Sequence, residues 1–388
     1  MPVTLGSTRL IASGRLKGLT VGVVANPASV DHEFVHVVDR VRAADGVTLG
    51  AIFGPQHGFR SDLQDNMIET PHGHDPARRV PVYSLYSETR EPTAEMLAGL
   101  DVLVIDLQDI GARIYTFIYT MANCLRACGT HGVPVIVCDR PNPIGGVDVE
   151  GETLVAGFES FVGLFPIPMR HGLTIGELAR LFNERFALGA SLEVVTMEGW
   201  QRAHYADHCR LPWVMPSPNM PTLDSAIVYP GTVLLEGTLA SEGRGTTRPF
   251  EVVGAPWVRA EAFADRLNGH GLPGVVFRPA VFEPTFQKHH GTTCEGGQIH
   301  VIDRAAFRPV VTGVAVIEEL RRAGSSAFAW RPPPYEYEHR LMPIDILAGS
   351  SLTRELIDAG AAAESIAAGW ADDEAAFRAL RAPHLLYG

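Results

Sequence analysis

The sequence predicts an α/β protein, with a Rossmann-like domain built on a parallel sheet and a second, smaller α+β domain. Short runs rich in Val and Ile, each bounded by Gly, Pro, Asp or Asn, recur through the first half of the chain. Such runs are typical of strands buried on both faces. Helical stretches separate them, and repeated β-α-β alternation indicates a parallel sheet covered by helices on both sides. After about residue 236 the pattern changes to shorter, mixed elements.

The first domain is predicted from these periodicities in chain order. Its strand runs are residues 19–25, 49–53, 80–85, 102–105, 133–138 and 192–197. Helical spacing of apolar residues predicts helices at residues 33–44, 93–100, 115–128 and 174–186. Thr174 and Glu177 have the spacing of a capping box, which favours a helix start at that point.

The second domain is predicted to begin near residue 240. Residues 212–221, shortly before it, hold four prolines and are expected to be loop. Further along, we expect strands at residues 274–278 and 298–301, a helix at 310–323 and an Ala-rich helical tail at 352–385. We therefore assign residues 1–240 to a Rossmann-like domain and residues 241–388 to an auxiliary α+β domain.

The composition is that of a folded, acidic enzyme. Of 388 residues, 46% are hydrophobic and 20% are charged, and the formal net charge is −12. An acidic surface repels phosphate backbones and anionic lipids. No apolar run approaches the roughly 20 residues that cross a bilayer. We expect no nucleic-acid partner and no membrane contact, and the sequence does not predict the oligomeric state.

The sequence favours a cytoplasmic protein. Polar residues and Gly interrupt every apolar run before residue 20, unlike the pattern of a secretory signal. The five cysteines are scattered, without the spacing of a disulfide framework or a zinc site. A periplasmic or secreted form whose signal has been removed is the alternative.

Polar residues follow four of the predicted strands. They are Asn26 after the first strand, Gln56, His57 and Arg60 after the second, Asp106, Asp109, Arg113 and Tyr115 after the fourth, and Asp139, Arg140 and Asn142 after the fifth. The carboxyl ends of parallel strands meet at one sheet edge, where ligands bind, so we expect one shared site. A helix cap is the alternative for a single Asp, and a surface ion pair is the alternative for Asp109 with Arg113.

Two loops add further candidates. They are Asp62, Asp65 and Glu69 in the loop that continues from the second strand, and Glu242, Arg244 and Arg248 in the Gly-rich segment 241–251. Long polar loops in compact domains are usually either functional or disordered, and interspersed apolar residues favour an ordered first loop. We interpret the second segment as an anion- or sugar-binding loop, with a structural turn as the alternative.

A metal ion was also considered. His32, Glu33 and His36 match the HExxH pattern of zinc metalloproteases. A catalytic zinc needs a third ligand, and no metzincin-type extension follows, so a solvated helix start is favoured instead. A phosphate loop and a GxGxxG turn after a strand are also absent from the sequence. We therefore predict no metal and no cofactor.

Five motifs in order resemble those of the exo-β-N-acetylmuramidase family, long known only as a domain of unknown function. They are residues 53–58 (FGPQHG), 106–113 (DLQDIGAR), 139–143 (DRPNP), 216–221 (PSPNMP) and 242–247 (EGRGTT). The resemblance extends from the first strand to about Gly349. It implies a cleft between two domains and release of N-acetylmuramic acid from non-reducing ends of peptidoglycan fragments. The lactyl carboxylate of that sugar is a suitable partner for Arg113, Arg140, Arg244 or Arg248.

One position departs from the family pattern. Many members have Glu before the His of the Gly-Pro-x-His-Gly motif, whereas this chain has Gln56, and an amide cannot act as a general acid. The hypothesis is that Glu69 is the acid, with Glu242 second, and that Asp106 and His57 complete the catalytic set. The predicted substrate-binding residues are Gln56, Arg60, Asp109, Arg113, Tyr115, Asp139, Arg140, Asn142, Asn219, Arg244 and Arg248.

Two alternatives to this function are kept open. Gln56 favours a hydrolase of a different amino sugar or of an amide on the same scaffold. A non-catalytic saccharide-binding protein that has lost its acid is the other alternative. In every case the expected ligand is a small saccharide or a peptidoglycan fragment, and the sequence does not predict a retaining or an inverting outcome.

Overall fold

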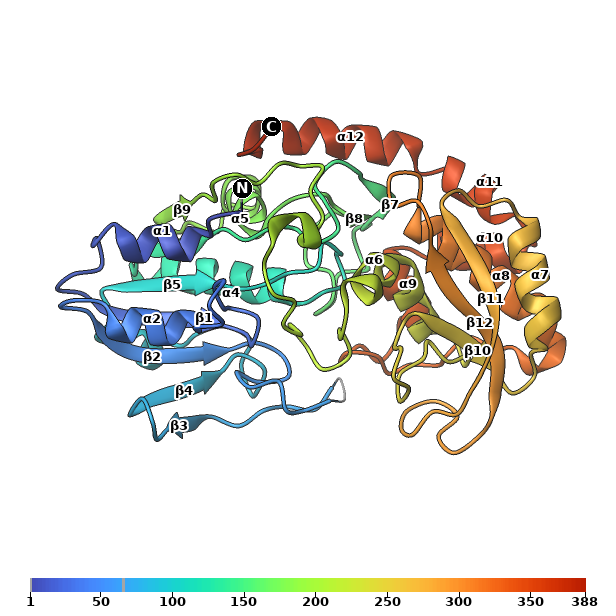
Figure 1. Ribbon diagram of the computed structural model, residues 1–388, viewed down its shortest axis with the longest axis horizontal. Helices are drawn as coiled ribbons and strands as arrows, with labels where there is room; N and C mark the ends of the chain where they lie inside the picture. The colour runs from blue at the N-terminus through green and yellow to red at the C-terminus, as the bar shows by residue number, and fades with distance from the viewer. Residues whose placement is uncertain (1, 65–66) are drawn as a thin grey trace.

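The computed structural model describes residues 2–64 and 67–388. Its larger sheet has seven strands in the order β3-β4-β2-β1-β5-β6-β9. All neighbouring strands in this sheet are parallel except β3, which runs antiparallel to β4 at the edge. The parallel strands follow the order of a Rossmann fold, in which the direction of winding reverses between β1 and β5. The predicted fold class is confirmed, and Figure 1 shows this sheet on the left and the smaller domain on the right.

The bounds of the elements are as follows. The strands are β1 (Thr20–Ala25), β2 (Thr48–Gly54), β3 (Gly73–Asp75), β4 (Val80–Ser84), β5 (Val102–Asp106), β6 (Val135–Cys138), β7 (Glu150–Thr153), β8 (Pro168–Arg170), β9 (Leu192–Val195), β10 (Val252–Ala255), β11 (Val275–Phe282) and β12 (Cys294–Val301). The α-helices are α1 (Gly6–Ala12), α2 (Val37–Ala43), α3 (Ala94–Leu97), α4 (Phe117–His131), α5 (Ile175–Arg185), α6 (Leu223–Thr232), α7 (Ala260–Gly269), α8 (Pro309–Gly324), α9 (Pro343–Ala348), α10 (Leu352–Asp358), α11 (Ala363–Ala368) and α12 (Ala371–Arg381). The 3₁₀ turns are η1 (Ala206–Cys209), η2 (Val233–Gly237), η3 (Ser325–Ala327) and η4 (Ala382–His384).

The six predicted strand runs of the first domain coincide with β1, β2, β4, β5, β6 and β9. Every residue of β1 and β5 except Thr20 is buried, and Val and Ile hold six of these ten buried positions. Helices cover both faces of a parallel sheet, which explains the burial. The capping box of Thr174 and Glu177 is present at the start of α5. Sequence patterning missed β3, because this three-residue edge strand, Gly-His-Asp, carries no apolar run.

The HExxH segment is not helical, which corrects the predicted helix at 33–44. The helix α2 begins only at Val37, with His36 as its N-cap. Asp31 Oδ1 accepts the backbone N–H groups of Glu33 (2.9 Å) and Val35 (3.1 Å), and this local turn competes with a helix. Both ring nitrogens of His36 contact backbone groups, so the ring faces its own loop rather than a metal site.

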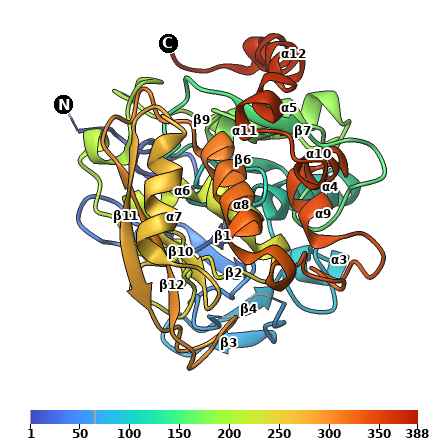
Figure 2. The ribbon, with the colours of Figure 1, turned by 90° about the vertical axis from the view of Figure 1, so that its right-hand side faces the viewer.

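The second domain is built around a three-stranded antiparallel sheet in the order β10-β12-β11. The helix α7 packs on β11 and β12 and also contacts α8 (Figure 2). Helix α8 in turn packs on α6, the helix that leads directly into η2. The α6–α8 pair, together with α9, therefore holds η2, the turn that carries Glu236.

The α6–α8 contact depends on two glycines that bring the backbones together. A Cβ atom on Gly231 would lie 1.8 Å from the carbonyl oxygen of Pro309. A Cβ atom on Gly313 would lie 2.2 Å from the carbonyl oxygen of Gly231. Since backbone atoms cannot move aside as a side chain can, both positions require glycine.

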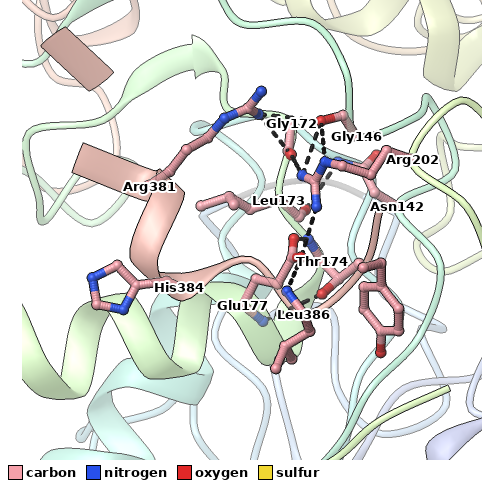
Figure 3. A network of polar contacts seen from close by, with 12 residues as sticks. Asn142, Gly146, Gly172, Leu173, Thr174, Glu177, Arg202, Arg381, His384 and Leu386 are labelled. Atoms are coloured by element: carbon pink, nitrogen blue, oxygen red, sulfur yellow. Dashed lines mark hydrogen bonds and ion pairs between the residues drawn. The ribbon is translucent and has the colours of Figure 1, made fainter. Parts of the chain in front are cut away.

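The C-terminal segment returns to the first domain, and α12 runs along the top of the molecule in Figure 1. The guanidinium of Arg381 donates to the carbonyl oxygens of Gly172 (2.8 Å), His171 (3.0 Å) and Val147 (2.7 Å). The backbone N–H of Leu386 donates to Glu177 Oε1 at 2.8 Å (Figure 3). The end of the chain is thus part of the sheet domain.

Helices in the described ranges 2–64 and 67–388 are all too short or too polar to cross a bilayer. The division into residues 1–240 and 241–388 stays a prediction, since helices of the C-terminal segment pack on both parts.

We predict that Gly313→Ala lowers the free energy of unfolding by about 1–3 kcal/mol, because the added methyl overpacks a backbone contact. Urea denaturation followed by circular dichroism measures this. Gly269→Ala is the matched control: no atom lies within 4 Å of its added Cβ, and the expected change is a gain of up to about 1 kcal/mol. Equal stability of both variants would contradict the proposed close contact.

Candidate active site

A pocket lies beyond the carboxyl ends of β2 and β5, where the second domain closes it. Its empty space, including the open mouth, is about 510 Å³. Its lining comes from both parts of the chain. The residues are Gln56, His57, Ile114, Tyr115, Thr116, Phe117, Val162, Ser217, Asn219, Met220, Tyr229, Glu236, Arg244, Phe250, Tyr335 and Glu336.

Glu236 is held in the pocket as an ionised carboxylate. Its Oε1 accepts from Arg244 Nη2 at 2.6 Å, and its Oε2 accepts from the Tyr335 hydroxyl at 2.8 Å. Burial opposes ionisation, but Arg244 and the Tyr335 hydrogen bond outweigh it, so the pKa of Glu236 lies below its usual range. The η2 turn positions this side chain.

Arg244 and Lys288 connect this carboxylate to the loops behind the pocket. Arg244 Nε lies 3.4 Å from Glu242 Oε1, and Lys288 Nζ lies 2.6 Å from Glu242 Oε2. Lys288 Nζ also donates to the carbonyl oxygens of Leu235, Thr238 and Ala240 at 2.7–3.1 Å. Two cations and two carboxylates therefore alternate, and Lys288 anchors the chain on both sides of Glu236.

Glu336 is the second carboxyl group of the pocket, and its pKa is shifted in the opposite direction to that of Glu236. The Tyr86 hydroxyl donates to its Oε2 at 3.0 Å, and Gln56 Nε2 lies 3.5 Å from its Oε1. Burial and the neighbouring charge of Glu236 raise the pKa of Glu336 to about 7, although both hydrogen bonds lower it. Glu336 is therefore largely protonated below neutral pH.

The backbone at Glu336 is strained. Glu336 and Tyr337 have φ angles of 45° and 68°, and they form the two-residue turn between Tyr335 and Glu338. Such turns favour Asn and Gly, since positive φ costs other residues roughly 1 kcal/mol or more. Strain of this kind clusters at functional sites.

Gln56 and His57 form the wall contributed by β2. Gln56 Oε1 accepts from the Thr116 hydroxyl at 2.8 Å, which directs its amide nitrogen toward Glu336. His57 Nδ1 lies 2.7 Å from the carbonyl oxygen of Leu63, so Nδ1 is the donor and Nε2 is an acceptor. Burial lowers the pKa of His57 to about 4, so the ring is neutral at pH 7.

The structure brings part of the predicted site together. Five of the predicted residues line the pocket: Gln56, His57, Tyr115, Asn219 and Arg244. Asn219 donates to the carbonyl oxygen of Gln64 at 3.0 Å and so holds the loop after β2 against the Pro-rich segment. Of the four arginines suggested for the lactyl carboxylate, Arg244 is the one that lines the pocket.

Other predicted residues lie behind the pocket and support the sheet edge. Asp106 pairs with Arg140 at 3.0 Å, and both are buried. Asp109 Oδ2 accepts the backbone N–H of Gly111 at 2.7 Å, which is a turn contact. Arg113 is fully buried and donates to the carbonyl oxygens of residues 347 and 348.

Asp139 and Asn142 also make structural contacts, with the start of α5 and with the residue just before it. Asp139 accepts from the Thr174 hydroxyl and from the backbone N–H of Gly176, both at 2.8 Å, at the start of α5. Burial raises the pKa of Asp139 to about 7. Asn142 donates to the carbonyl oxygen of Leu173 at 3.0 Å.

The remaining candidates lie outside the pocket lining. Glu69 is half exposed and pairs with Arg90 at 3.1 Å. Glu242 is buried behind Arg244, and Arg248 is half exposed beside Glu251. Arg60 and Asp62 are exposed, and Asp65 lies outside the described residues. The catalytic and binding roles assigned to all these residues from the sequence stay predictions.

Sequence reasoning missed Glu236, Tyr335 and Glu336. Glu236 ends the apolar run Val-Leu-Leu, and a carboxylate in an otherwise buried segment is a signal that could have been used. Glu336 follows three consecutive prolines and precedes another Glu two residues later, a pattern that resembles an exposed loop. Only the fold brings it to Gln56.

The comparisons with known proteins bear on this pocket. Residues 21–224 match the family model described as exo-beta-N-acetylmuramidase NamZ, N-terminal, and residues 227–387 match the corresponding C-terminal model. The chain belongs to the NamZ family.

A curated NamZ relative and two solved structures extend this result. The peptidoglycan beta-N-acetylmuramidase NamZ of Bacillus subtilis (strain 168) is 45% identical over 373 residues, which cover 96% of this chain and 88% of the relative. Two crystal structures of DUF1343 family proteins from Bacteroides fragilis NCTC 9343 superpose with TM-scores of 0.88 and 0.76. They are 35% and 26% identical, and each comparison covers 100% of this chain and 99% of the other.

One cluster in this NamZ-family chain has metal-ligating side chains. Within the described residues, His270, Glu318 and Glu319 bring ligand atoms within 4.8 Å of one another. They do not line the pocket. Arg266 lies 2.7 Å and Arg322 3.6 Å from Glu319, and these two cations compete with a metal ion for the same carboxylate.

We predict that Arg244→Met lowers the free energy of unfolding at neutral pH by about 3–5 kcal/mol, because two buried carboxylates lose their shared cation. The loss should shrink at acidic pH, where Glu236 takes up a proton. Chemical denaturation at several pH values measures both effects.

Arg248→Met is the matched control. This arginine is half exposed, and its partner Glu251 is buried but also accepts from the hydroxyl groups of Thr222 and Ser225. The expected cost is therefore well below that of Arg244→Met. A similar loss for the two variants would contradict the special role of Arg244.

Proposed function

We propose that this chain is an exo-β-N-acetylmuramidase that releases N-acetylmuramic acid from the non-reducing ends of peptidoglycan fragments. The observation that carries the proposal is a pair of buried glutamates in one pocket, with pKa values moved in opposite directions. Glycosidases need one carboxylic acid and one carboxylate, and environments that separate two pKa values identify the acid and its partner. Membership of the NamZ family supports the sugar and the mode of cleavage.

Glu336 is assigned as the general acid. Its proton passes to the glycosidic oxygen as the bond to the anomeric carbon breaks, and the leaving sugar departs with a new hydroxyl group. Gln56 and Tyr86 hold the carboxyl group in place through its two oxygens. Many family members have Glu at the position of Gln56, and Gln56 lies beside the carboxyl group of Glu336. In this proposal the pocket therefore has an acid even though position 56 is an amide.

Glu236 is assigned as the ionised partner. Its negative charge stabilises the positive charge that grows at the anomeric carbon, and it acts as the base or the nucleophile of the second step. The separation of the two carboxyl groups around bound substrate decides the outcome: about 5–5.5 Å favours retention and roughly 6.5–9.5 Å favours inversion.

Glu336 replaces Glu69 and Glu242 as our candidate acid for two physical reasons. Glu69 is half exposed and is not part of the pocket lining, so neither burial nor position favours it. Glu242 is bound by Arg244 and Lys288 behind the pocket and is not part of the pocket lining. The cytoplasmic location expected from the sequence is part of the same proposal.

We predict that Glu336→Gln lowers kcat/KM for an N-acetylmuramyl-N-acetylglucosamine disaccharide about 10²–10⁴-fold, the usual contribution of a general acid. The same variant should still cleave N-acetylmuramyl fluoride, since fluoride departs without a proton. Glu236→Gln should lose both activities.

Glu33→Gln is the matched control, because this exposed Glu pairs with Arg40 and is not part of the pocket lining. It should keep full activity. Loss of activity in Glu33→Gln, together with inhibition by a chelator, would favour the zinc interpretation of the HExxH segment over the two-glutamate mechanism.

We also predict a bell-shaped pH dependence of kcat/KM. Activity should fall as the pH rises through about 7, where Glu336 loses its proton, and fall again at acidic pH, where Glu236 becomes protonated. Tyr86→Phe should move the alkaline limb upward, because the Tyr86 hydrogen bond lowers the pKa of Glu336. An alkaline limb that does not move in this variant would contradict the assignment.

A further inference from the structure

Arg113 carries a fully enclosed positive charge whose hydrogen-bonding groups are only partly satisfied. The residue is 0% exposed. Its Nη2 donates to the carbonyl oxygens of Leu347 and Ala348 at 3.0 and 2.6 Å, at the end of α9. Its Nε and Nη1 are buried as well, and neither has a hydrogen-bond acceptor within residues 2–64 and 67–388. Arginine has donors only and stays protonated in proteins, so these N–H groups require an acceptor that the described chain does not supply.

Arg113 also lacks a carboxylate to balance its charge. Arg140, at the same edge of the sheet, pairs with a buried carboxylate at 3.0 Å. No ion pair of this kind forms at Arg113 within the described ranges. Glu152 acts on Arg113 from a greater distance, and the two oxygens of Glu152 accept from the hydroxyls of Ser350 and Thr353. A buried charge without a close partner is strongly unfavourable, so a small anion beside the guanidinium would be stabilising.

Further donors face the same place. A Cβ atom on Gly163 would lie 3.6 Å from Arg113 Nη1, so this nitrogen faces the backbone at residue 163. The hydroxyl oxygen of Tyr119, a buried residue of α4, faces the backbone N–H of Leu164. That N–H can only donate, and the Tyr119 hydroxyl has no acceptor of its own among the described residues. Guanidinium, hydroxyl and backbone N–H groups therefore gather around residues 163–164, and all of them are hydrogen-bond donors.

The space beside Nη1 suits a ligand of one heavy atom. The Cβ position on Gly163 lies 3.5 Å from both methyl carbons of Leu154 and 3.6 Å from Arg113 Nη1. These are ordinary van der Waals separations, so one atom fits where glycine has no side chain. On another side, a Cβ atom on Gly349 would lie only 2.8 Å from the same nitrogen. A carboxylate or phosphate group, with three or more heavy atoms, would be crowded in this enclosure.

We propose that Arg113, Tyr119 and the backbone N–H of Leu164 form a buried halide site, which takes up chloride from ordinary salt solutions. A set of donors repels a metal cation. A water molecule needs acceptors for its own protons, whereas a halide needs donors alone. The charge of Arg113 attracts an anion in a way that it does not attract neutral water. Arg113 and Tyr119 do not line the pocket, so this anion is distinct from the substrate carboxylate, and the inference does not depend on the proposed function.

The halide site lies where the sheet domain meets α9. Arg113 follows β5, Tyr119 lies in α4, and the guanidinium holds the end of α9 through two carbonyl oxygens. Helix α9 packs on η2, the turn that carries Glu236. A halide that neutralises Arg113 would thus strengthen the contact between the sheet domain and the helices that hold η2.

The test measures thermal unfolding of the full-length protein in potassium chloride, potassium bromide and potassium gluconate at equal ionic strength. A halide that binds only the folded state should raise the melting temperature by about 1–3 °C relative to gluconate, and the gain should saturate with concentration. Gly163→Ala fills the space beside Nη1 with a methyl group at ordinary contact distances. This variant should fold and should lose the halide-dependent gain.

Two tyrosine variants separate the halide site from a general effect of salt. Tyr119→Phe removes one donor and should reduce the gain. Tyr205→Phe is the matched control, because its hydroxyl donates to the carbonyl oxygen of Arg304 at 3.0 Å, and it should keep the full gain. Anomalous diffraction from crystals grown in bromide locates the ion directly. We expect a peak in contact with Arg113 Nη1 in the wild type and none there in Gly163→Ala.

Each contrary outcome is specific. No bromide peak at Arg113 in the wild type, or a melting temperature that does not differ between halide and gluconate, would overturn the halide site. An equal gain in the wild type and in Gly163→Ala would also overturn it, because the ion would then bind elsewhere. None of these measurements uses enzymatic activity, so their outcome is independent of whether the chain cleaves muramyl glycosides.

Discussion

Charge compensation at Glu236 is the interaction on which the site depends. A carboxylate in a closed pocket stays ionised only where a cation and hydrogen-bond donors replace the water it has lost. Arg244 and Tyr335 supply them, and Glu242 and Lys288 hold Arg244 in turn. Once Glu236 is charged, its field adds to the cost of ionising the neighbouring glutamate. The buried ion pair thus keeps Glu236 charged and, together with the burial of Glu336, favours the protonated form of that second acid.

This arrangement needs both parts of the chain. The sheet domain contributes Gln56 and His57, which lie at the end of β2. Ligands usually bind beyond such strand ends in parallel sheets, so these two residues could be predicted. Residues 227–387, which match the C-terminal family model, contribute the charged groups through η2 and the hairpin at Tyr335. η2 packs on α9, α6 and α8, so the packing of these helices sets the position of a carboxylate against the loops of the sheet domain.

Much of the fold was predictable from the sequence because its cause is local. Val and Ile runs predict buried strands wherever they occur, and Thr174 with Glu177 marks a helix start from four residues alone. The edge strand β3 and the non-helical segment at His36 escaped prediction, because they depend on pairing and side-chain turns that periodicity does not record.

The site was predictable only in part. Residues that follow β2 and β5 were found, because topology places them at one edge. Asp106 and Asp139 have the same chemistry and the same location in the sequence pattern, yet they hold Arg140 and the start of α5. Gln56 and Glu336 are 280 residues apart in the sequence, and only tertiary packing brings them into contact.

The attachment of the C-terminal residues to the sheet domain has a consequence for biosynthesis. The carboxylate of Glu177, which is buried in α5, accepts a hydrogen bond from the backbone N–H of Leu386. The carboxylate of Asp139 accepts one from the Tyr387 hydroxyl at 2.5 Å. During translation these groups are made about 200 residues before their partners emerge from the ribosome, at roughly 5–20 residues per second. These two contacts of the first domain therefore form only after the intervening second domain has been synthesised.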